Sequence, residues 1–234
     1  IGVPGPIFAD GTVNRCVNLG WGVFNVADKV RELLDMPELT VKVGNDANVA
    51  ALGELWQGGG KGFENLVMVT LGTGVGGGVI INGKVFSGSN GYGTELGHTV
   101  IVTDGEDCSC GRKGCWEAYA SATALIRQTK RAMADHPESA MWNISPTLEE
   151  VNGKTAFDGM RAGDATAIEV CEKYIEYVAT GVVDMINIFQ PEILCIGGGI
   201  SKEGENLRKP IEDYANEFRF GKKAKKKNLL SGRL

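Results

Sequence analysis

The segment from residue 98 to residue 115 contains four side chains that could bind a metal ion. They are His98, Cys108, Cys110 and Cys115, and Gly111 and Gly114 between the last two cysteines allow the chain to turn tightly. One neutral imidazole and three thiolates make a complete tetrahedral ligand set for a structural zinc ion. The types and spacing of these residues therefore predict a zinc site.

Other roles for the cysteines have to be weighed against zinc. The three could be ordinary buried thiols, or two of them could form a disulfide, since the total of six is even. Cys171 lies in a helical pattern and Cys195 in an apolar strand pattern, as buried thiols do. We expect a cytoplasmic protein, in which disulfides are rare. Spacing and compartment together favour zinc.

Two carboxylates flank this segment. Glu95 lies one helical turn before His98, and Glu117 follows two residues after Cys115. A metal ion would hold both carboxylates and an edge of the imidazole in a fixed relation. We therefore expect a corner that binds substrate as well as a structural site.

Composition narrows the functional classes. The 234 residues are 43% hydrophobic, enough for one large domain or two small ones, and the net charge of −5 argues against a nucleic-acid-binding surface. No apolar run approaches the roughly 20 residues that span a bilayer. The 34 glycines are about twice the average share, and they gather at 58–60, 72–78, 88–93 and 197–199. Such clusters indicate places where backbone approaches something closely.

Asp46 stands at a predicted turn from strand to helix. Thr40–Val43 reads as a short strand, and the segment from Ala47 to Gln57 is rich in helix formers before three glycines. The local pattern favours Asp46 as a helix N-cap. The alternative is a carboxylate that points into a cleft.

A glycine-rich turn follows the predicted strand Leu66–Leu71. Gly72, Thr73 and Gly74 could expose successive backbone N–H groups as an anion-binding nest, although a plain tight turn is equally compatible. The next strand includes residues 79–81, and Asn82-Gly83 predicts a hairpin that returns through residues 85–86.

The second half of the chain predicts two helices and one strand. The helices are Ser121–Ala134 and Asp164–Phe189, and the apolar positions of the second recur at three- and four-residue spacing, as in a buried stripe. The strand Ile193–Ile196 leads into Gly197, Gly198 and Gly199. Strand, glycines and then helix is the order expected of a nucleotide-contacting loop.

Together these segments resemble the ROK family (repressors, open reading frames and sugar kinases), most closely its bacterial glucokinases. The matching segments run in family order over roughly residues 1 to 220, and they are 2–6, 18–21, 45–54, 71–78, 95–98, 108–117 and 196–200. The resemblance implies an α/β protein with the actin-like ATPase (ribonuclease H-like) fold, in which two α/β domains surround a cleft. Residues 1–45 would be the remainder of a truncated N-terminal domain. Residues 46–234 would be the large C-terminal domain, with a zinc-binding insertion at 98–115.

The resemblance also implies roles for individual residues. Asp46 becomes the general base of an ATP-dependent hexose kinase acting on the 6-hydroxyl of glucose, and its place at a helix N-terminus stabilises the anion. The implied sugar ligands are Asn45, Glu95, His98 and Glu117, with Gly5 and Trp21 nearby. Gly72, Thr73 and Gly74 would contact phosphates, and Gly197, Gly198 and Gly199 the adenosine. ATP, Mg²⁺ and structural Zn²⁺ are the implied cofactors, and a homodimer is expected.

The sequence departs from the family at both ends. The family's first phosphate turn is absent, so we expect the polypeptide as written to be inactive in phosphoryl transfer. The lysine run that begins at Lys222 does not resemble the family's C-terminal helix, and a solvated terminus is favoured over a nucleic-acid tail. A partial gene or a frameshift would explain both departures.

Three other functions remain open at this stage. A ROK sugar-sensing repressor would share the sugar pocket, but the intact Gly-Thr-Gly turn and the pair Asn45 and Asp46 favour a kinase. A kinase for fructose or an N-acetylhexosamine would share most of these residues. The hypothesis of a zinc-ribbon module that binds nucleic acid is disfavoured, because the ligands of such a module normally come as two separated pairs and the net charge of this chain is negative.

Overall fold

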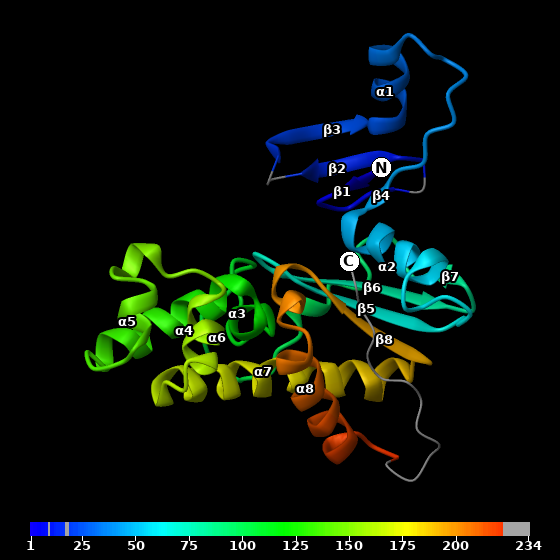
Figure 1. Cartoon of the computed structure of the whole chain (residues 1–234). Coiled ribbons are helices and arrows are strands. Elements are labelled where there is room, and N and C mark those ends of the chain that lie inside the picture. The colour runs from blue at the N-terminus through cyan, green and yellow to red at the C-terminus, as the bar shows by residue number, and fades with distance from the viewer. Residues whose placement is uncertain (9, 17–18, 222–234) are drawn as a thin grey trace.

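The computed structural model describes residues 1–8, 10–16 and 19–221 and has a mixed α/β architecture with a small upper part and a larger lower part (Figure 1). The strands are β1 (Gly2–Val3), β2 (Thr12–Cys16), β3 (Trp21–Asn25), β4 (Gly44–Asn45), β5 (Leu66–Leu71), β6 (Val75–Ile81), β7 (Lys84–Val85) and β8 (Ile193–Gly197). The α-helices are α1 (Val26–Leu34), α2 (Asp46–Gln57), α3 (Glu117–Ala120), α4 (Ala122–Asp135), α5 (Met141–Ile144), α6 (Thr155–Arg161), α7 (Ala165–Phe189) and α8 (Glu205–Phe218). The 3-10 helices are η2 (Leu96–His98), η3 (Leu148–Glu150) and η4 (Gly199–Glu203). Asn18 and the lysine run after Gly221 lie outside the described residues.

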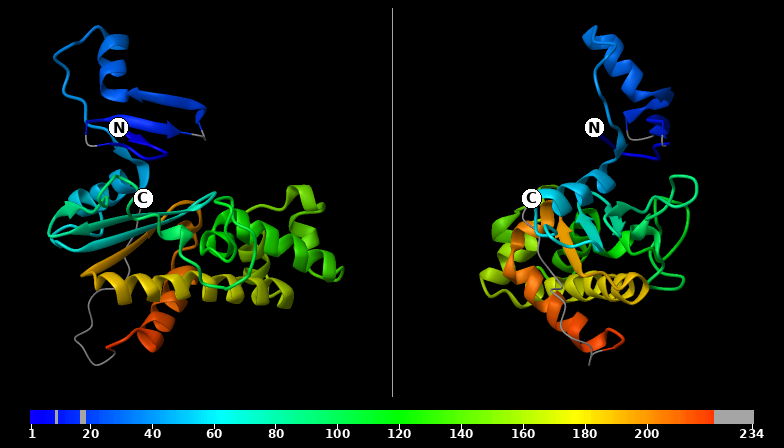
Figure 2. Two further views of the ribbon diagram at one scale, coloured as in Figure 1. Left: turned by 180° about the vertical axis from the view of Figure 1, so that it is seen from behind. Right: turned by 90° about the vertical axis from the view of Figure 1, so that its right-hand side faces the viewer.

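The upper part has its own small core. Strand β1 pairs in parallel with β4, β2 pairs antiparallel with β3, and α1 packs against the second pair. The buried side chains there are Val3, Val13, Cys16 and Val26. Figure 2 shows this part standing apart from the rest of the chain when viewed from behind and from the side. We keep as a proposal the division into an N-terminal domain of residues 1–45 and a C-terminal domain of residues 46–234 with a zinc-binding insertion at 98–115.

The predicted strand Thr40–Val43 is wrong. Strand β4 begins only at Gly44, opposite Gly2 in the parallel register. In this register Val43 would lie opposite Ile1, and residues 40–42 have no strand partner among the described residues. The ammonium group of Ile1 donates to the carbonyl of Lys42 instead, at 2.7 Å.

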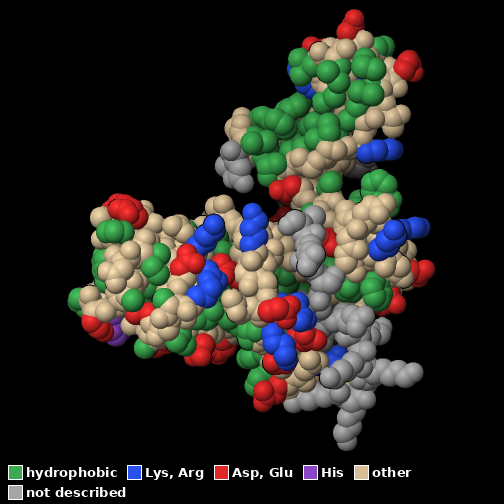
Figure 3. Space-filling model, in the orientation of Figure 1, with side chains coloured by type: hydrophobic (Ala, Val, Ile, Leu, Met, Phe, Trp, Pro, Cys, Tyr) green, Lys and Arg blue, Asp and Glu red, His purple; other side chains and the backbone are tan. Residues whose placement is uncertain are grey.

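Hydrophobic side chains gather on the visible surface of the upper part (Figure 3). The exposed large apolar residues in this part of the chain are Ile1, Phe8, Leu19, Trp21, Val23, Leu33, Leu34 and Met36. An apolar surface of this kind marks an interaction site in many proteins. No other described segment covers it.

The lower part is built on a four-stranded sheet with the order β7-β6-β5-β8. Strand β5 is antiparallel to β6 and parallel to β8. Alternate side chains of β5 enter two different cores: Leu66 and Met68 lie on one side, and Val67, Val69 and Leu71 lie on the other. Burial on both faces explains why this strand is a continuous apolar run. The predictions of Leu66–Leu71 and of the hairpin at Asn82-Gly83 are confirmed.

Helices cover both faces of this sheet, with α2 above it and α7 below it (Figures 1 and 2). The predicted helix Asp164–Phe189 is confirmed as α7, and Asp164 is its N-cap, accepting from the N–H of Ala167. The predicted helix Ser121–Ala134 is α4, capped by Ser121. No helix in the described part of the chain is long and apolar enough to cross a membrane.

Glycines in β6 allow α2 to approach the sheet closely. A Cβ atom at Gly78 would lie 2.7 Å from the carbonyl oxygen of Ala47 and 2.7 Å from the Cβ of Ala51, both on α2. A Cβ at Gly76 would lie 2.5 Å from the hydroxyl of Thr70. The sheet and α2 therefore approach each other closely at the glycines of residues 72–78, as the sequence predicts. This packing fixes the distance between the sheet and Asp46, the first residue of α2.

A test of this packing compares two glycines. Gly78→Ala must push α2 outward, so we expect the free energy of unfolding to fall by about 1–3 kcal/mol. Gly53 lies on the exposed side of α2, and a Cβ atom added there would have no neighbour within 4 Å. Gly53→Ala should therefore raise the free energy of unfolding by about 0.5–1 kcal/mol, through helix propensity. Urea denaturation measures both, and equal effects at the two positions would contradict the packing.

Candidate active site

A cleft of about 690 Å³ collects most of the residues that the sequence singles out. Its lining comes from residues 4–6 of the upper part, the start of α2, the turn between β5 and β6, residues 91–95, and the first residue of α3. The predicted site residues that line it are Gly5, Asn45, Asp46, Gly72, Thr73, Gly74, Glu95 and Glu117. Segments that are distant in the sequence thus meet in one cavity.

Asp46 is the first residue of α2, and the N-cap is Asn45. The cap role that the local pattern favours for Asp46 is therefore wrong. The side-chain Oδ1 of Asn45 accepts from the N–H groups of Ala47, at 3.0 Å, and Asn48, at 3.2 Å. Oδ1 of Asp46 accepts from the N–H of Ala47 at 2.9 Å, and its Oδ2 has no partner among the described residues. The exposed carboxylate of Asp46 is thus free to take part in chemistry, at the positive end of a helix dipole.

Asn45 has limited hydrogen-bonding capacity left for a ligand. Its Oδ1 already accepts two hydrogen bonds, and its Nδ2 donates weakly to the carbonyl of Gly5, at 3.3 Å. One N–H of the amide remains. Asn45 can therefore serve a ligand as a donor and not as an acceptor.

Glu95 is exposed and stands immediately before η2. The loop that precedes it reaches the upper part of the molecule, because Nδ2 of Asn14 donates to the hydroxyl of Tyr92 at 2.7 Å. A Cβ at Gly91 in the same loop would lie 3.0 Å from the carbonyl oxygen of Ile7. The position of Glu95 is thereby coupled to the position of the upper part.

Removing this coupling gives a test. Tyr92→Phe deletes one neutral hydrogen bond, and for the hexose kinase that the sequence resemblance implies we expect KM for the hexose to rise about threefold with little change in kcat. Asn14→Ala should have the same effect, and the double variant should be no worse than either single one. Steady-state kinetics measure this, and additive effects would contradict a shared contact.

Glu117 connects the metal-binding segment with the glycine turn. Its Oε2 accepts from the backbone N–H of Val75 at 2.9 Å, and its Oε1 accepts from the hydroxyl of Ser109 at 3.3 Å. It lines the cleft as predicted. Unlike Asp46, it has a described partner at both oxygens.

The two predicted nucleotide loops lie side by side. Thr70 pairs with Gly197 in the parallel ladder of β5 and β8, so both loops leave the same edge of the sheet. A Cβ at Gly198 would lie 2.5 Å from the carbonyl oxygen of Leu71, and its φ of 87° is in the region that favours glycine. Gly197, Gly198 and Gly199 are outside the lining of the cleft itself, next to Gly72.

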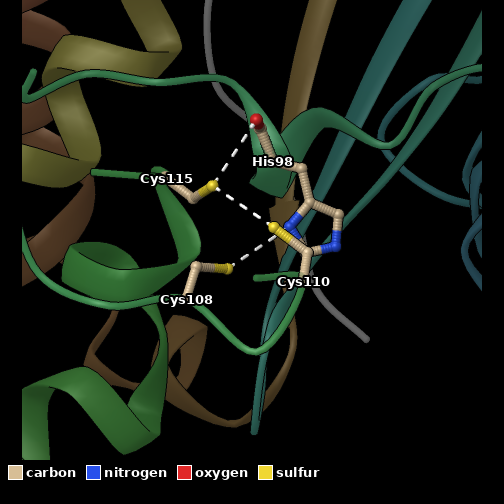
Figure 4. A group of neighbouring side chains, drawn as sticks. All are labelled: His98, Cys108, Cys110 and Cys115. Carbon is tan, nitrogen blue, oxygen red and sulfur yellow. Dashed lines mark hydrogen bonds between the residues drawn. The ribbon is translucent and has the colours of Figure 1, made fainter. Parts of the chain in front are cut away.

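The four predicted metal ligands form a compact cluster (Figure 4). Their ligand atoms all lie within 4.8 Å of one another. Sγ of Cys110 is 3.7 Å from Sγ of Cys115, and Sγ of Cys108 is 3.6 Å from Nδ1 of His98. A tetrahedron with metal–sulfur bonds of about 2.3 Å has edges of about 3.8 Å. The donor set and its spacing fit a tetrahedral metal, and no disulfide links the cysteines of the described structure.

The thiols of this cluster differ in acidity. The backbone N–H of Arg112 lowers the pKa of Cys110. Burial raises the pKa of Cys115 to about 12 in the absence of a cation. A bound metal supplies the positive charge that a thiolate at Cys115 requires.

Two expected sugar-pocket residues do not line the cleft. His98 turns its Nδ1 toward the cysteines, and Trp21 packs beside Phe24 in β3, with ring centroids 5.3 Å apart. Arg15 does line the cleft, and sequence reasoning missed it because it belongs to no motif. Its φ of 59° is a strained conformation for arginine, of the kind found at functional sites, and no sequence signal announces it.

Charge in the cleft is unbalanced. Among the described residues that line it, Asp46, Glu95 and Glu117 are the carboxylates and Arg15 is the only cation. A polyphosphate entering this site therefore needs an accompanying cation.

Comparison with known proteins identifies the family. The sequence profile of the ROK family matches residues 1–230. The chain belongs to the ROK family. This ROK protein is 40% identical to the glucokinase of Halalkalibacterium halodurans over 220 residues, which cover 93% of the chain and 66% of that glucokinase. It is 34% identical to the xylose repressor of Caldicellulosiruptor bescii over 224 residues, covering 94% of the chain and 54% of that repressor. The ROK protein thus spans about half to two thirds of the length of these relatives.

A solved relative confirms the predicted fold. The ROK family glucokinase of Streptomyces griseus, determined with glucose and AMPPNP, superimposes with a TM-score of 0.87 at 34% identity. The match covers 98% of this chain and 74% of that one. The ROK protein therefore has the α/β actin-like ATPase fold of the ROK sugar kinases.

Proposed function

We propose that this ROK protein transfers the γ-phosphoryl group of ATP to the 6-hydroxyl of glucose, with Asp46 as the general base. The observation that carries the proposal is one cleft that holds a free carboxylate at a helix N-terminus, two further carboxylates and a glycine turn. The similarity to glucokinases, one of them bound to glucose and AMPPNP, supports this choice of substrates.

Asp46 supplies what phosphoryl transfer asks of a base. Its Oδ2 has no partner in the described structure, so it can accept a hydrogen bond from a sugar hydroxyl and then the proton. Its Oδ1 is held by the N–H of Ala47, which fixes the carboxylate against the cleft wall. Catalysis of this kind rests mainly on positioning the attacking oxygen in line with the phosphorus.

The sugar would be held by groups of complementary hydrogen-bonding character. Glu95 offers two acceptors for the hydroxyls of a vicinal diol, and Asn45 offers one donor. Each carboxylate oxygen of Glu117 accepts one hydrogen bond, from Val75 or from Ser109, and its remaining lone pairs can accept from the sugar. His98 is outside the described lining of the cleft, and for it we propose that Nδ1 binds the metal while Nε2 donates to the sugar.

The nucleotide would be held by the two glycine loops at the edge of the sheet. Gly72, Thr73 and Gly74 would meet phosphates, and Gly197, Gly198 and Gly199 the adenosine. Mg²⁺ would enter with ATP and neutralise charge on the phosphates. The surplus of carboxylates in the cleft fits such an ion.

Zinc is proposed as a structural ion held by His98, Cys108, Cys110 and Cys115. The tetrahedral edges of the cluster and the buried thiol of Cys115 support this choice. The ion would fix the segment that carries Ser109 and leads into Glu117. We further propose a cytoplasmic homodimer that acts without nucleic acid or membrane.

A second candidate is a sugar-sensing repressor, favoured by the identity of 34% to a xylose repressor. Nucleotide binding separates the two proposals. Isothermal titration of the protein encoded by the whole gene with AMPPNP and Mg²⁺ should give one site per chain for the kinase. Sugar binding without nucleotide binding would favour the repressor.

The choice among hexoses has its own test. Kinase activity should be measured with glucose, fructose, N-acetylmannosamine and N-acetylglucosamine. We expect the highest kcat/KM for glucose, and a higher value for another hexose would change the assigned substrate.

A further inference from the structure

We infer that Glu117 is a positioning residue for the nucleotide turn, in addition to the sugar contact proposed for it. The inference rests on the proposed function. In this role the Oε2 atom of Glu117 accepts a hydrogen bond from the backbone N–H of Val75. Val75 is the residue that follows the turn formed by Gly72, Thr73 and Gly74.

The turn is shaped to admit this carboxylate. A Cβ atom at Gly74 would lie 2.2 Å from Oε2 of Glu117, so a side chain there would displace the carboxylate from the place where it accepts from the N–H of Val75 at 2.9 Å. A charged acceptor makes a stronger hydrogen bond than a neutral one. The contact therefore holds the end of the turn.

The other fixed points of the turn are its carbonyl groups. The N–H of Ala122 donates to the carbonyl of Gly72 at 2.8 Å, and the hydroxyl of Thr123 donates to the carbonyl of Thr73 at 2.8 Å. Within the described structure, the N–H groups of Thr73 and Gly74 donate to no acceptor. They are the groups that remain for phosphate oxygens, and a turn held at both ends presents them without further ordering.

Glu117 itself stands on a rigid support. The preceding residue, Trp116, is fully buried, and its indole N–H donates to the carbonyl of Tyr177 at 2.9 Å. A Cβ at Gly181 would lie 2.1 Å from the Trp116 ring, so α7 is shaped to accept the indole. The carboxylate is thus anchored to the core of the lower part, and the turn is anchored to the carboxylate.

One carboxylate would therefore serve both substrates, and the two roles can be separated. Glu117→Gln keeps an acceptor oxygen for the N–H of Val75 but loses the charge and one acceptor. Glu117→Met has a similar length and no acceptor able to hold the turn. Both variants lose the same charge, so the difference between them reports the hydrogen bond alone.

The experiment measures ADP binding and glucose binding separately, by isothermal titration of the protein encoded by the whole gene. We expect Glu117→Met to weaken ADP binding about tenfold and Glu117→Gln to change it less than twofold. Both should weaken glucose binding. Glu95→Ala, which removes a cleft carboxylate away from the turn, should weaken glucose binding only.

The outcomes against the inference are distinct. Equal ADP affinity in Glu117→Met and the wild type would overturn it, and so would equal losses in the Gln and Met variants. A wild type that binds no ADP would overturn the proposed function and this inference with it. If Glu117→Met does not fold, amide hydrogen exchange of Val75 in the wild type decides: slow exchange supports the contact, and fast exchange overturns it.

Discussion

Replacing Asp46 with asparagine is expected to lower kcat about 10²- to 10⁴-fold while glucose affinity stays within about twofold. Asparagine retains an oxygen for the N–H of Ala47, so the side chain keeps its place. It cannot take the proton from the attacking hydroxyl. Because Asn45 is the cap of α2, the substitution leaves the helix start intact. Steady-state kinetics and glucose titration measure the two quantities.

The control is a carboxylate in the first turn of another helix. Asp28 lies in the first turn of α1, outside the cleft, where Arg31 donates to it at 2.7 Å. Asp28→Asn should leave kcat unchanged. Turnover retained in Asp46→Asn would remove the assignment of the base.

Loss of a metal ligand should have the second largest effect. Cys110→Ser is expected to reduce bound zinc from about one ion per chain to a small fraction, and to weaken glucose binding at least about tenfold. Residues 99–116 form no helix or strand. Their strand-like contacts are single bridges, of Val100 to Cys115 and of Asp107 to Lys113, supplemented by isolated hydrogen bonds such as that of the Gly114 N–H to the carbonyl of Glu106. Without the ion, Ser109 loses the support that places its hydroxyl beside the carboxylate of Glu117.

Metal analysis of the purified variant and glucose titration test this expectation. Cys171→Ala is the matched control, because Cys171 is a buried thiol of α7 that does not belong to the metal cluster, and the variant should retain zinc. A Cys110→Ser protein that binds glucose normally without zinc would contradict the structural role of the metal.

Local sequence pattern predicted the elements whose signals are strong and self-contained. The apolar run of β5 and the long stripe of α7 were assigned within one residue of their limits. The local pattern predicted the wrong N-cap for α2, where two neighbouring residues could both cap the helix. Asn45 and Asp46 are both good N-caps, and only the pairing of Asn45 with Val3 in β1 decides which residue leaves the strand and caps the helix.

The rest of the site depends on contacts between distant segments. The adjacency of the two glycine loops follows from the parallel pairing of β5 with β8, which comes much later in the chain. The contact of Glu117 with Val75 follows from the packing of Trp116 in the core. Neither can be read from residue spacing. The family resemblance brought these loops into one prediction, and the structure shows the physical reason.

Formation of glucose 6-phosphate tests the central claim most directly. The protein encoded by the whole gene should be incubated with ATP, Mg²⁺ and glucose, with zinc quantified in the same preparation. The account predicts ATP-dependent glucose 6-phosphate, with about one zinc ion per chain, and its loss in Asp46→Asn. Glucose binding with zinc present, but no phosphorylation of glucose or of any other hexose, would contradict it.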